Sequence, residues 1–424
     1  MSRRLHLRRT PLLVSLAAVA AMVVAAPLEA QDLVLVRANV VDVRDGTVRR
    51  DATVVVRDGR IVSVGGTAPR DGSVRTVDLQ GMYLMPGLID AHVHISTFDQ
   101  ARRALDSGVT TVRSMGADNY TDVGLGALAA AGTIESPEVV AAGYHVRPSP
   151  AEDFFKNHPD LGHYRAGGIV GTEAVRAMAR ALVSRDIDFI KVNATERAGL
   201  PDTDPRKQLY GVEEMRVLVE EARAAGIQGV AAHAHGDEGG RAAVDAGVRS
   251  IEHGTYLSPE TLARMAEQGT FLVPTVAIVR DLTIPGGDYE SPVLQMRGRH
   301  MLPRVQETVG HAHRAGVRIV AATDTGYGPN SVVRLSHEVE ELVTIGLSAR
   351  EALQAATVTA AELLGVADRT GHIAEGMEAD LIVTERNPLE DVRALQDVLL
   401  VVNDGRVAMT KGDWFAAARA SSSW

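Results

Sequence analysis

The sequence predicts an α/β fold: a (β/α)8 TIM barrel with a small discontinuous β-sandwich domain that the N- and C-terminal segments form together. Three observations support this prediction. Strand-like and helix-like segments alternate between residues 86 and 376, eight strand-like runs can be counted there, and short alternating strands occur at both ends of the chain. An open, doubly wound parallel sheet would agree with the same alternation.

The composition is that of a globular protein large enough for one main domain and a smaller one. The chain has 424 residues, of which 45% are hydrophobic and 23% charged, and its formal net charge is −10. This negative charge disfavours nucleic acids and anionic membranes as partners. The chain has no cysteine, so a metal site would be built from histidines, carboxylates or a modified lysine.

The first thirty residues have the pattern of a secretory signal peptide. Four arginines within the first nine residues precede an uncharged apolar run, residues 11–26, and a small residue, Ala30, stands before Gln31. We expect cleavage near Ala30 and a periplasmic or secreted protein, with Sec and twin-arginine export both open. An uncleaved anchor is the alternative, although the apolar run is short for a bilayer.

Short alternating strands with Asp-Gly turns occur at both ends of the remaining chain. They lie between residues 33 and 77 and again at 380–385 and 398–412. We therefore predict a signal peptide over 1–30, a composite β-sandwich domain from 31–85 and 377–415, and the barrel over 86–376.

Eight short runs in the barrel region are predicted to be parallel strands, with helices such as 212–226 and 258–269 between them. The strands are expected at 87–94, 110–114, 138–143, 188–193, 228–235, 249–254, 270–275 and 318–326. Residues 146–171, which include Phe154 and Phe155, are expected to form a lid or a pocket wall.

Residues of metal-binding types occur where several of these strands end. Barrel enzymes build their sites at the carboxyl ends of the strands, so these side chains are expected at one mouth. His92 and His94 are two apart and would face the same side of a strand. The remaining candidates are Lys191, His233, His235, His253 and Asp324.

Lys191 is the least expected of these candidate metal-binding residues, because the chain has only four lysines. A protonated ammonium at this point would repel divalent cations, whereas a chemically modified, anionic lysine would bridge them. An unmodified surface lysine and a substrate-binding ammonium are the alternatives.

The motifs PGLIDAHVH, FIKVN, AAHAHG, SIEHGT and ATDTG occur in one order along these strands, and GHIAEGMEADLIVTERNPLED follows near the C-terminus. In this order they resemble the amidohydrolase superfamily, and more narrowly its imidazolonepropionase-like and prolidase-like branch, which includes dipeptidases and ochratoxinase-type amidases. The resemblance implies that His92, His94 and Asp324 bind one metal ion and that His233 and His253 bind another. It also implies a carboxylated Lys191 that bridges both ions.

Three assignments keep an alternative. Either His233 or His235 could be the ligand from the fifth strand; the family spacing favours His233 and leaves His235 to polarise the substrate carbonyl. His145 follows the third strand and, with Tyr144 and Arg147, would hold a carbonyl oxygen or a carboxylate, or be a plain loop residue. Asp324 could cap a helix instead of binding metal.

The resulting functional hypothesis is a binuclear metal-dependent hydrolase of an amide-type C–N bond in a dipeptide or an N-acyl amino acid. Two divalent ions, for which zinc suits the ligands best, would activate water, and Asp324 would accept its proton. A lactone, ester or cyclic amide hydrolase is the enzymatic alternative, and a non-catalytic metal-binding barrel is the alternative of a different class. The expected partner is a small-molecule substrate without nucleic acid or membrane; the exact substrate, the metal and self-association stay open.

Overall fold

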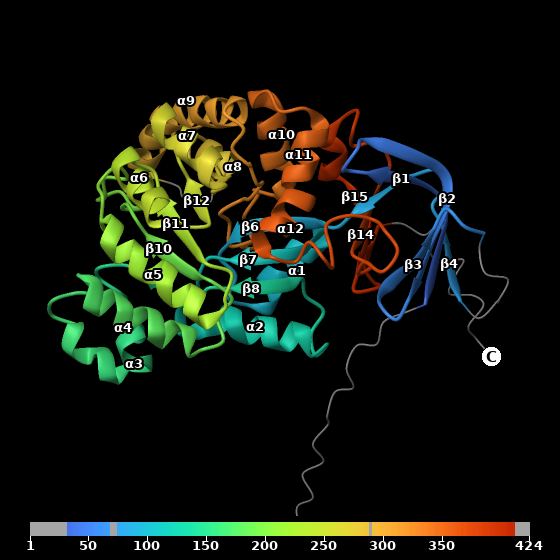
Figure 1. The fold of residues 1–424 in the computed structure, drawn as a ribbon. Coiled ribbons are helices and arrows are strands. Elements are labelled where there is room, and N and C mark those ends of the chain that lie inside the picture. Colours follow the sequence, from blue (N-terminus) through green and yellow to red (C-terminus); the bar gives the residue numbers. More distant parts are fainter. Residues whose placement is uncertain (1–31, 68–73, 288–290, 412–424) are drawn as a thin grey trace, which may run out of the picture.

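The computed structural model describes residues 32–67, 74–287 and 291–411, so the predicted signal peptide lies outside the described residues. Two parts lie side by side in Figure 1: a sheet built from both ends of the chain, and parallel strands surrounded by helices. Among the described helices, none combines the length and the hydropathy that a membrane crossing requires.

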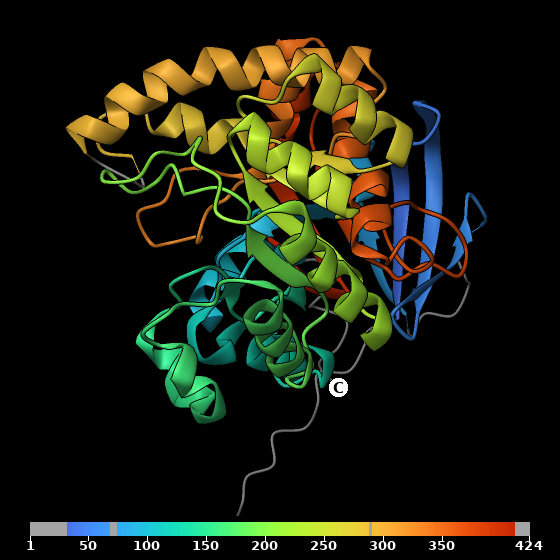
Figure 2. The same cartoon turned by 60° about the vertical axis from the view of Figure 1, so that its left-hand side comes forward.

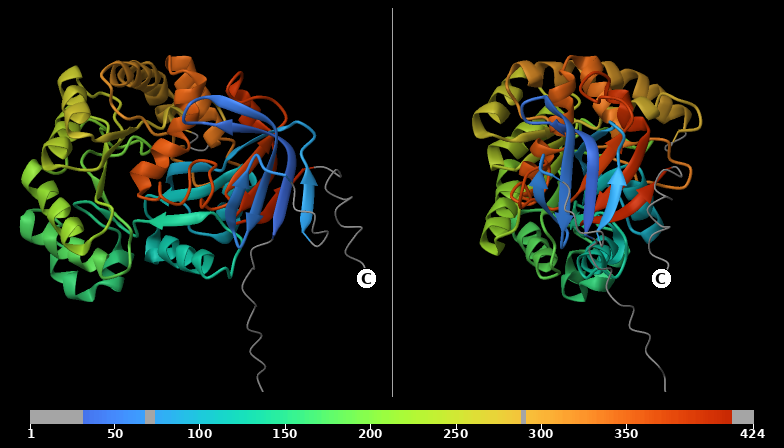
Figure 3. Two further views of the ribbon diagram at one scale, coloured as in Figure 1. Left: turned by 45° about the vertical axis from the view of Figure 1, so that its right-hand side comes forward. Right: turned by 90° about the vertical axis from the view of Figure 1, so that its right-hand side faces the viewer.

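The first part is one eight-stranded sheet to which both ends of the chain contribute (Figure 3). Its strands run in the order β16-β15-β14-β5-β1-β2-β3, with β4 beside β1. The antiparallel pairing of β14 with β5 joins the two ends. The strands are β1 (Leu33–Asp42), β2 (Thr47–Arg57), β3 (Arg60–Val64), β4 (Arg75–Asp78), β5 (Tyr83–Pro86), β14 (Leu381–Thr384), β15 (Val398–Asn403) and β16 (Arg406–Thr410).

Apolar side chains from both ends of the chain hold this sheet together. Leu35 and Val54 from the N-terminal strands are fully buried in the same cluster as Leu381 and Leu400 from the C-terminal strands. Because each end alone would leave apolar side chains exposed, the two segments stabilise one another. The arrangement as a two-layer sandwich stays a prediction.

The second part contains two parallel sheets. One has the order β6-β7-β8 and the other β13-β12-β11-β10-β9. The strands are β6 (Leu88–Val93), β7 (Val109–Ser114), β8 (Glu138–Ala141), β9 (His145–Val146), β10 (Ile190–Asn193), β11 (Val230–Ala234), β12 (Ser250–His253) and β13 (Phe271–Val273). One short stretch, residues 138–146, pairs with β7 through β8 and with β10 through β9, and so connects the two sheets.

The strand predicted at 318–326 is irregular, so that prediction is wrong as a continuous strand. Only two bridges form in this segment, from Ile319 to β13 and from Thr325 to β6. The backbone N–H of Thr323 donates to the Asp90 side chain at 3.0 Å, which replaces a ladder bond. Asp324 has a φ of 55°, which no regular strand allows. The segment nevertheless lies between β13 and β6.

Helices cover the outside of the parallel strands, and the long α9 spans one side of the molecule (Figure 2). The helices predicted at 212–226 and 258–269 are confirmed as α5 and α7, each ending at a left-handed glycine. The α-helices are α1 (Phe98–Asp106), α2 (Thr121–Ala130), α3 (Glu152–Asn157), α4 (Thr172–Val183), α5 (Val212–Ala225), α6 (Asp237–Ala246), α7 (Pro259–Gln268), α8 (Val276–Asp281), α9 (Pro292–Arg314), α10 (Leu335–Ile345), α11 (Ala349–Ala355) and α12 (Val358–Leu364), and the 3-10 helices are η1 (Asp118–Tyr120), η2 (Pro159–Tyr164) and η3 (Val392–Gln396).

Candidate active site

The structure brings all the predicted site residues to one cavity at the carboxyl ends of the parallel strands. The cavity measures about 130 Å³, a volume suited to ions and a few atoms of a substrate. The predicted residues that line it are His92, His94, His145, Lys191, His233, His235, His253 and Asp324.

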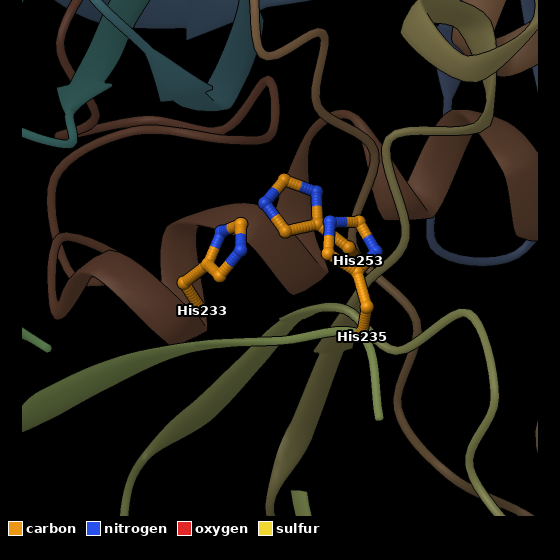
Figure 4. Close-up of side chains that lie close together, drawn as sticks. All are labelled: His233, His235 and His253. Atoms are coloured by element: carbon orange, nitrogen blue, oxygen red, sulfur yellow. The ribbon is translucent and has the colours of Figure 1, made fainter. Parts of the chain in front are cut away.

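Three imidazoles from β11, its carboxyl end and β12 face one another in Figure 4. The ring centroids of His233 and His253 are 4.5 Å apart, and that of His235 lies 4.8 Å from His233 and 4.7 Å from His253. One ligand atom of each lies within 4.8 Å of the others, and His92, His253 and Asp324 form a second such group. His253 belongs to both groups, so the two clusters are continuous.

Two of these residues hold a strained backbone conformation. His253 has a φ of 72° and Asp324 a φ of 55°, in the left-handed region that favours glycine. This conformation costs on the order of 1 kcal/mol for a residue with a Cβ. Such strain is typical of residues whose side chains are aimed by the surrounding structure at a ligand.

Two backbone carbonyls fix the orientation and the tautomer of two imidazoles. Nδ1 of His94 lies 3.2 Å from the carbonyl oxygen of Gly116, and Nε2 of His233 lies 3.2 Å from that of Glu196. A carbonyl only accepts, so these ring nitrogens carry the proton. The opposite nitrogens, Nε2 of His94 and Nδ1 of His233, therefore keep a lone pair for a cation.

Threonine hydroxyls, which can donate or accept, orient two further rings. Nδ1 of His235 lies 2.9 Å from Oγ1 of Thr255, and Nδ1 of His253 lies 2.8 Å from Oγ1 of Thr275. Burial lowers the pKa of His253 well below its ordinary value and that of His235 to about 3. Both rings are thus neutral at pH 7, the form in which histidine binds metal ions.

A buried ion pair stands behind His92. Nδ1 of His92 lies 2.8 Å from Glu252, whose carboxylate also accepts from Arg113 at 2.9 Å and from the hydroxyl of Ser250 at 2.5 Å. Burial alone would raise the pKa of Glu252, but the charge of Arg113, the hydrogen bond with His92 and the charge of Lys191 together outweigh this effect and lower the pKa to about 2. Glu252 is therefore ionised and directs Nε2 of His92 toward the cavity.

Lys191 lies in the cavity wall with 1% of its surface exposed. Its Nζ atom is buried and has no hydrogen-bond partner among the described residues. Burial lowers the pKa of this ammonium to about 8. An unpaired buried amine is costly, so its environment fits a covalent modification that removes the positive charge.

Asp324 faces the histidines from the irregular segment after β13. Its carboxylate lies 3.3 Å from Nε2 of both His92 and His94 and 4.0 Å from Nε2 of His253. Burial would raise its pKa, yet the facing imidazoles hold the pKa well below the ordinary value, so the group is a carboxylate. The donor set of imidazoles, one carboxylate and an unpaired amine fits divalent cations such as zinc.

His145 completes the rim of the cavity. Its Nδ1 atom is buried without a partner among the described residues, and burial lowers its pKa well below the ordinary value. The ring packs so closely on Gly116 that a Cβ there would lie 2.5 Å from it. The glycine is therefore needed for this placement of His145, as a neutral imidazole that offers one N–H donor.

A second cavity of about 600 Å³ adjoins the first and shares His94, His145 and Arg197 with it. Of the predicted lid, Arg147, Pro150 and Ala151 line this second cavity. Phe154 and Phe155 do not line either cavity. They are 0% and 4% exposed because they pack into the main core with Tyr144, so within the predicted segment it is Arg147, Pro150 and Ala151 that form a pocket wall.

Three contributors to the site were not predicted from the sequence. Asn193 lines the cavity, is 3% exposed, and its Oδ1 has no partner among the described residues. It follows Lys191 by two residues on β10, and this spacing was a signal that both share a face. Arg197 and Glu252 gave no such signal, because one lies in a loop and the other acts through a distant histidine.

Comparison with known proteins agrees with this geometry. The amidohydrolase family model matches residues 83–408. Ochratoxinase from Aspergillus niger is 30% identical over 351 residues, which cover 74% of this chain and 72% of that protein. Imidazolonepropionase from Acidiphilium cryptum is 30% identical over 365 residues, covering 76% and 83%.

A solved structure with the same architecture is a Xaa-Pro dipeptidase with methionine bound in its active site. It is 26% identical, has a TM-score of 0.78, and covers 89% of this chain and 99% of its own. Such neighbours imply a TIM-barrel fold with an extra domain, and the family is usually metal-dependent. The chain belongs to the amidohydrolase family and is a hydrolase that acts on carbon–nitrogen bonds.

Proposed function

We propose that the protein is a binuclear metal-dependent amidohydrolase that cleaves the amide bond of an N-acyl amino acid or a dipeptide. The observation that carries the proposal is the cavity itself, where five imidazoles each have one nitrogen held by a protein group and the other available. Family likeness adds His92, His94 and Asp324 as ligands of one ion and His233 and His253 as ligands of the other. The carboxylated Lys191 would bridge both.

The environment of Lys191 supports its carboxylation. Its pKa of about 8 leaves a substantial fraction of free amine near neutral pH, whereas an ordinary lysine has a pKa near ~10.4. Only the free amine attacks carbon dioxide; the new N–C bond forms while the amine loses a proton to solvent. The resulting carbamate turns a repelling cation into an anionic ligand.

Each group of the chain then has a role in hydrolysis. The cations, when bound, would supply Lewis acidity and lower the pKa of water. Asp324 would take the proton from the attacking water and pass it to the leaving nitrogen. His145 and His235, both neutral, would donate an N–H to the oxygen on which negative charge develops.

We also propose the fold and the localisation that go with this activity. The pairings of residues 138–146 and of Ile319 and Thr325 link neighbouring parallel strands, which supports closure into a (β/α)8 barrel. Residues 1–30 would direct export and be removed near Ala30. The N-terminal sequence of protein recovered from the periplasm or medium tests the cleavage.

The direct test combines metal analysis with a substrate panel. Purified protein is expected to hold about two divalent ions per chain and to release amino acids from Xaa-Pro, Xaa-Arg or N-acyl amino acid substrates. Lys191→Ala is expected to lose metal. A cyclic imidazolone belongs in the panel because of the imidazolonepropionase relative, as does a lactone. Full activity after chelation and dialysis to a metal-free state would refute the proposal.

A further inference from the structure

Two arginines in the second cavity have no carboxylate partner. Arg147 and Arg197 both line it, both are half-buried, and neither side chain has a hydrogen bond or an ion pair within the described residues. A shortage of carboxylates is not the reason, since the chain has 54 acidic residues against 44 basic ones. Arg176, for comparison, pairs with both Glu220 and Glu221 on the helix surface.

The two guanidinium groups lie in the same cavity and interact electrostatically. Burial lowers the pKa of Arg147, and the positive charge of Arg197 lowers it further, which indicates that the two charges repel one another across the cavity. Asp118, which lines the same cavity, and Asp153 raise the pKa of Arg147, each by less than Arg197 lowers it. An anion between the two arginines would relieve their repulsion and be held by charge-assisted hydrogen bonds.

The loop that carries Arg197 is held in place by an arginine of α9. Arg297 donates to the carbonyl oxygens of Ala198 at 2.5 Å, of Leu200 at 2.6 Å and of Thr203 at 2.6 Å. Glu196, the residue before Arg197, forms an ion pair with Lys207 at 2.7 Å. The backbone on both sides of Arg197 is therefore fixed, so its unpaired side chain belongs to a well-defined loop.

Part of the wall of the imidazole cavity is apolar. Ile278, Val279 and Leu282, from α8 and the residue after it, line this cavity together with Leu200, and none of these four residues lines the second cavity. The site thus has an apolar region at the imidazoles and a positive region in the second cavity. This arrangement distinguishes the two ends of a substrate by charge.

We propose that Arg147 and Arg197 form an anion subsite that binds a carboxylate of the substrate, while an apolar group of the substrate lies against α8. The proposal rests on amide hydrolysis at the imidazole cluster and names the substrate class: amides that carry a free carboxylate on one side of the scissile bond. Neutral amides of the same shape are poor substrates.

The experiment compares charged and neutral ligands in matched variants. The substrate pairs are N-acetyl-phenylalanine with N-acetyl-phenylalaninamide, and N-succinyl-phenethylamine with N-butyryl-phenethylamine, which place the charge on the amine side or on the acyl side. Binding of phenylacetate and phenylacetamide by calorimetry gives a readout independent of turnover. The variants are Arg147→Met, Arg197→Met and their double variant, with exposed Arg223→Met as control.

We expect the native protein to prefer the charged member by roughly 10- to 100-fold in kcat/KM for one of the two pairs, and to bind phenylacetate more tightly than phenylacetamide. Each single variant should lose most of this preference and Arg223→Met none; Arg147→Lys and Arg197→Lys should retain part of it. Equal use of charged and neutral ligands by the native protein, or an unchanged preference in the double variant, overturns the subsite.

These outcomes separate the subsite from the hydrolysis. If amides are cleaved without any preference for charge, the proposed function stands and the subsite is refuted. If no amide is cleaved but phenylacetate binding depends on Arg147 and Arg197, the subsite stands and the proposed function is refuted.

Discussion

The two ends of the parallel strands differ in whether their charged side chains are paired within the protein. At the end next to the composite sheet, Arg369 donates to Glu378 at 3.0 Å and to Glu138 at 2.6 Å, so its charge is matched within the protein. At the carboxyl ends, the side chains of Lys191 and Arg197 have no hydrogen-bond or ion-pair partner among the described residues. An unpaired buried group such as the amine of Lys191 costs about 1–3 kcal/mol, so stability is lost at this end to a group that is available to a ligand.

This difference shows how the fold separates stability from function. Charged contacts at the sheet junction tie the two parts of the chain together. The charges and imidazoles at the mouth are held on one side by hydrogen bonds and left open on the other, as a preorganised site requires. Substitutions at the two ends should therefore have different consequences, and four variants test this from the largest expected effect to the smallest.

Asp324→Asn should have the largest effect. The amide keeps the shape of the side chain but does not accept a proton, so kcat/KM should fall by roughly 100- to 10,000-fold while the fold persists. Steady-state kinetics and metal analysis check this, with the exposed Asp160→Asn as control. A variant that turns over at the native rate would remove Asp324 from the proton transfer.

Glu252→Gln should weaken metal binding by about 10- to 100-fold, because His92 loses the charged acceptor at its Nδ1. It also leaves the guanidinium of Arg113 unpaired in the interior, so thermal stability should fall. The double variant Arg113→Gln with Glu252→Gln removes the unpaired charge, and should regain stability but not metal affinity. Metal affinity is measured by competition with a chelator; native affinity in both variants would contradict the role of Glu252.

The sequence predicted the site residues correctly wherever two candidate ligands lie two residues apart along one strand. His92 with His94 and His233 with His235 follow the alternation of a strand, and strand ends placed Lys191 correctly. The pairs that hold them could not be predicted in this way. Glu252 contacts His92 across 160 residues, and Arg113 reaches Glu252 across 139, so neither leaves a local pattern.

The fold shows the same limit. Strands were predicted from short apolar runs, and seven of the eight are present as strands; the short β9, which follows the third of them, was not predicted. The segment at 318–326 has the apolar run of a strand but does not form a continuous ladder of backbone hydrogen bonds with a neighbouring strand. Asp90 accepts from both the backbone and the hydroxyl of Thr323 and from Tyr327, which bends the chain toward the cavity. Composition does not reveal this side-chain competition for backbone bonds.

Arg297→Lys should have a moderate effect, confined to substrate binding. An ammonium donates from a single point and does not span the carbonyls of Ala198, Leu200 and Thr203, so the loop with Arg197 should loosen. We expect KM for a carboxylate-bearing substrate to rise by roughly 3- to 10-fold with kcat nearly unchanged. A fall in kcat at constant KM would show that the loop acts in the chemical step instead.

Arg369→Met should have the smallest effect on catalysis and lower only stability. Removing the guanidinium leaves Glu138 unpaired and leaves Glu378 only its contact with Arg60 at 3.5 Å, and since these groups are partly exposed the loss should be about 1 kcal/mol. Chemical denaturation measures the loss, and kinetics on the same preparation should give the native kcat/KM. Because the junction lies at the opposite end of the strands from the imidazoles, a change in kcat/KM at full metal content would mean that the two ends are coupled and that stability and function are not separated in this fold.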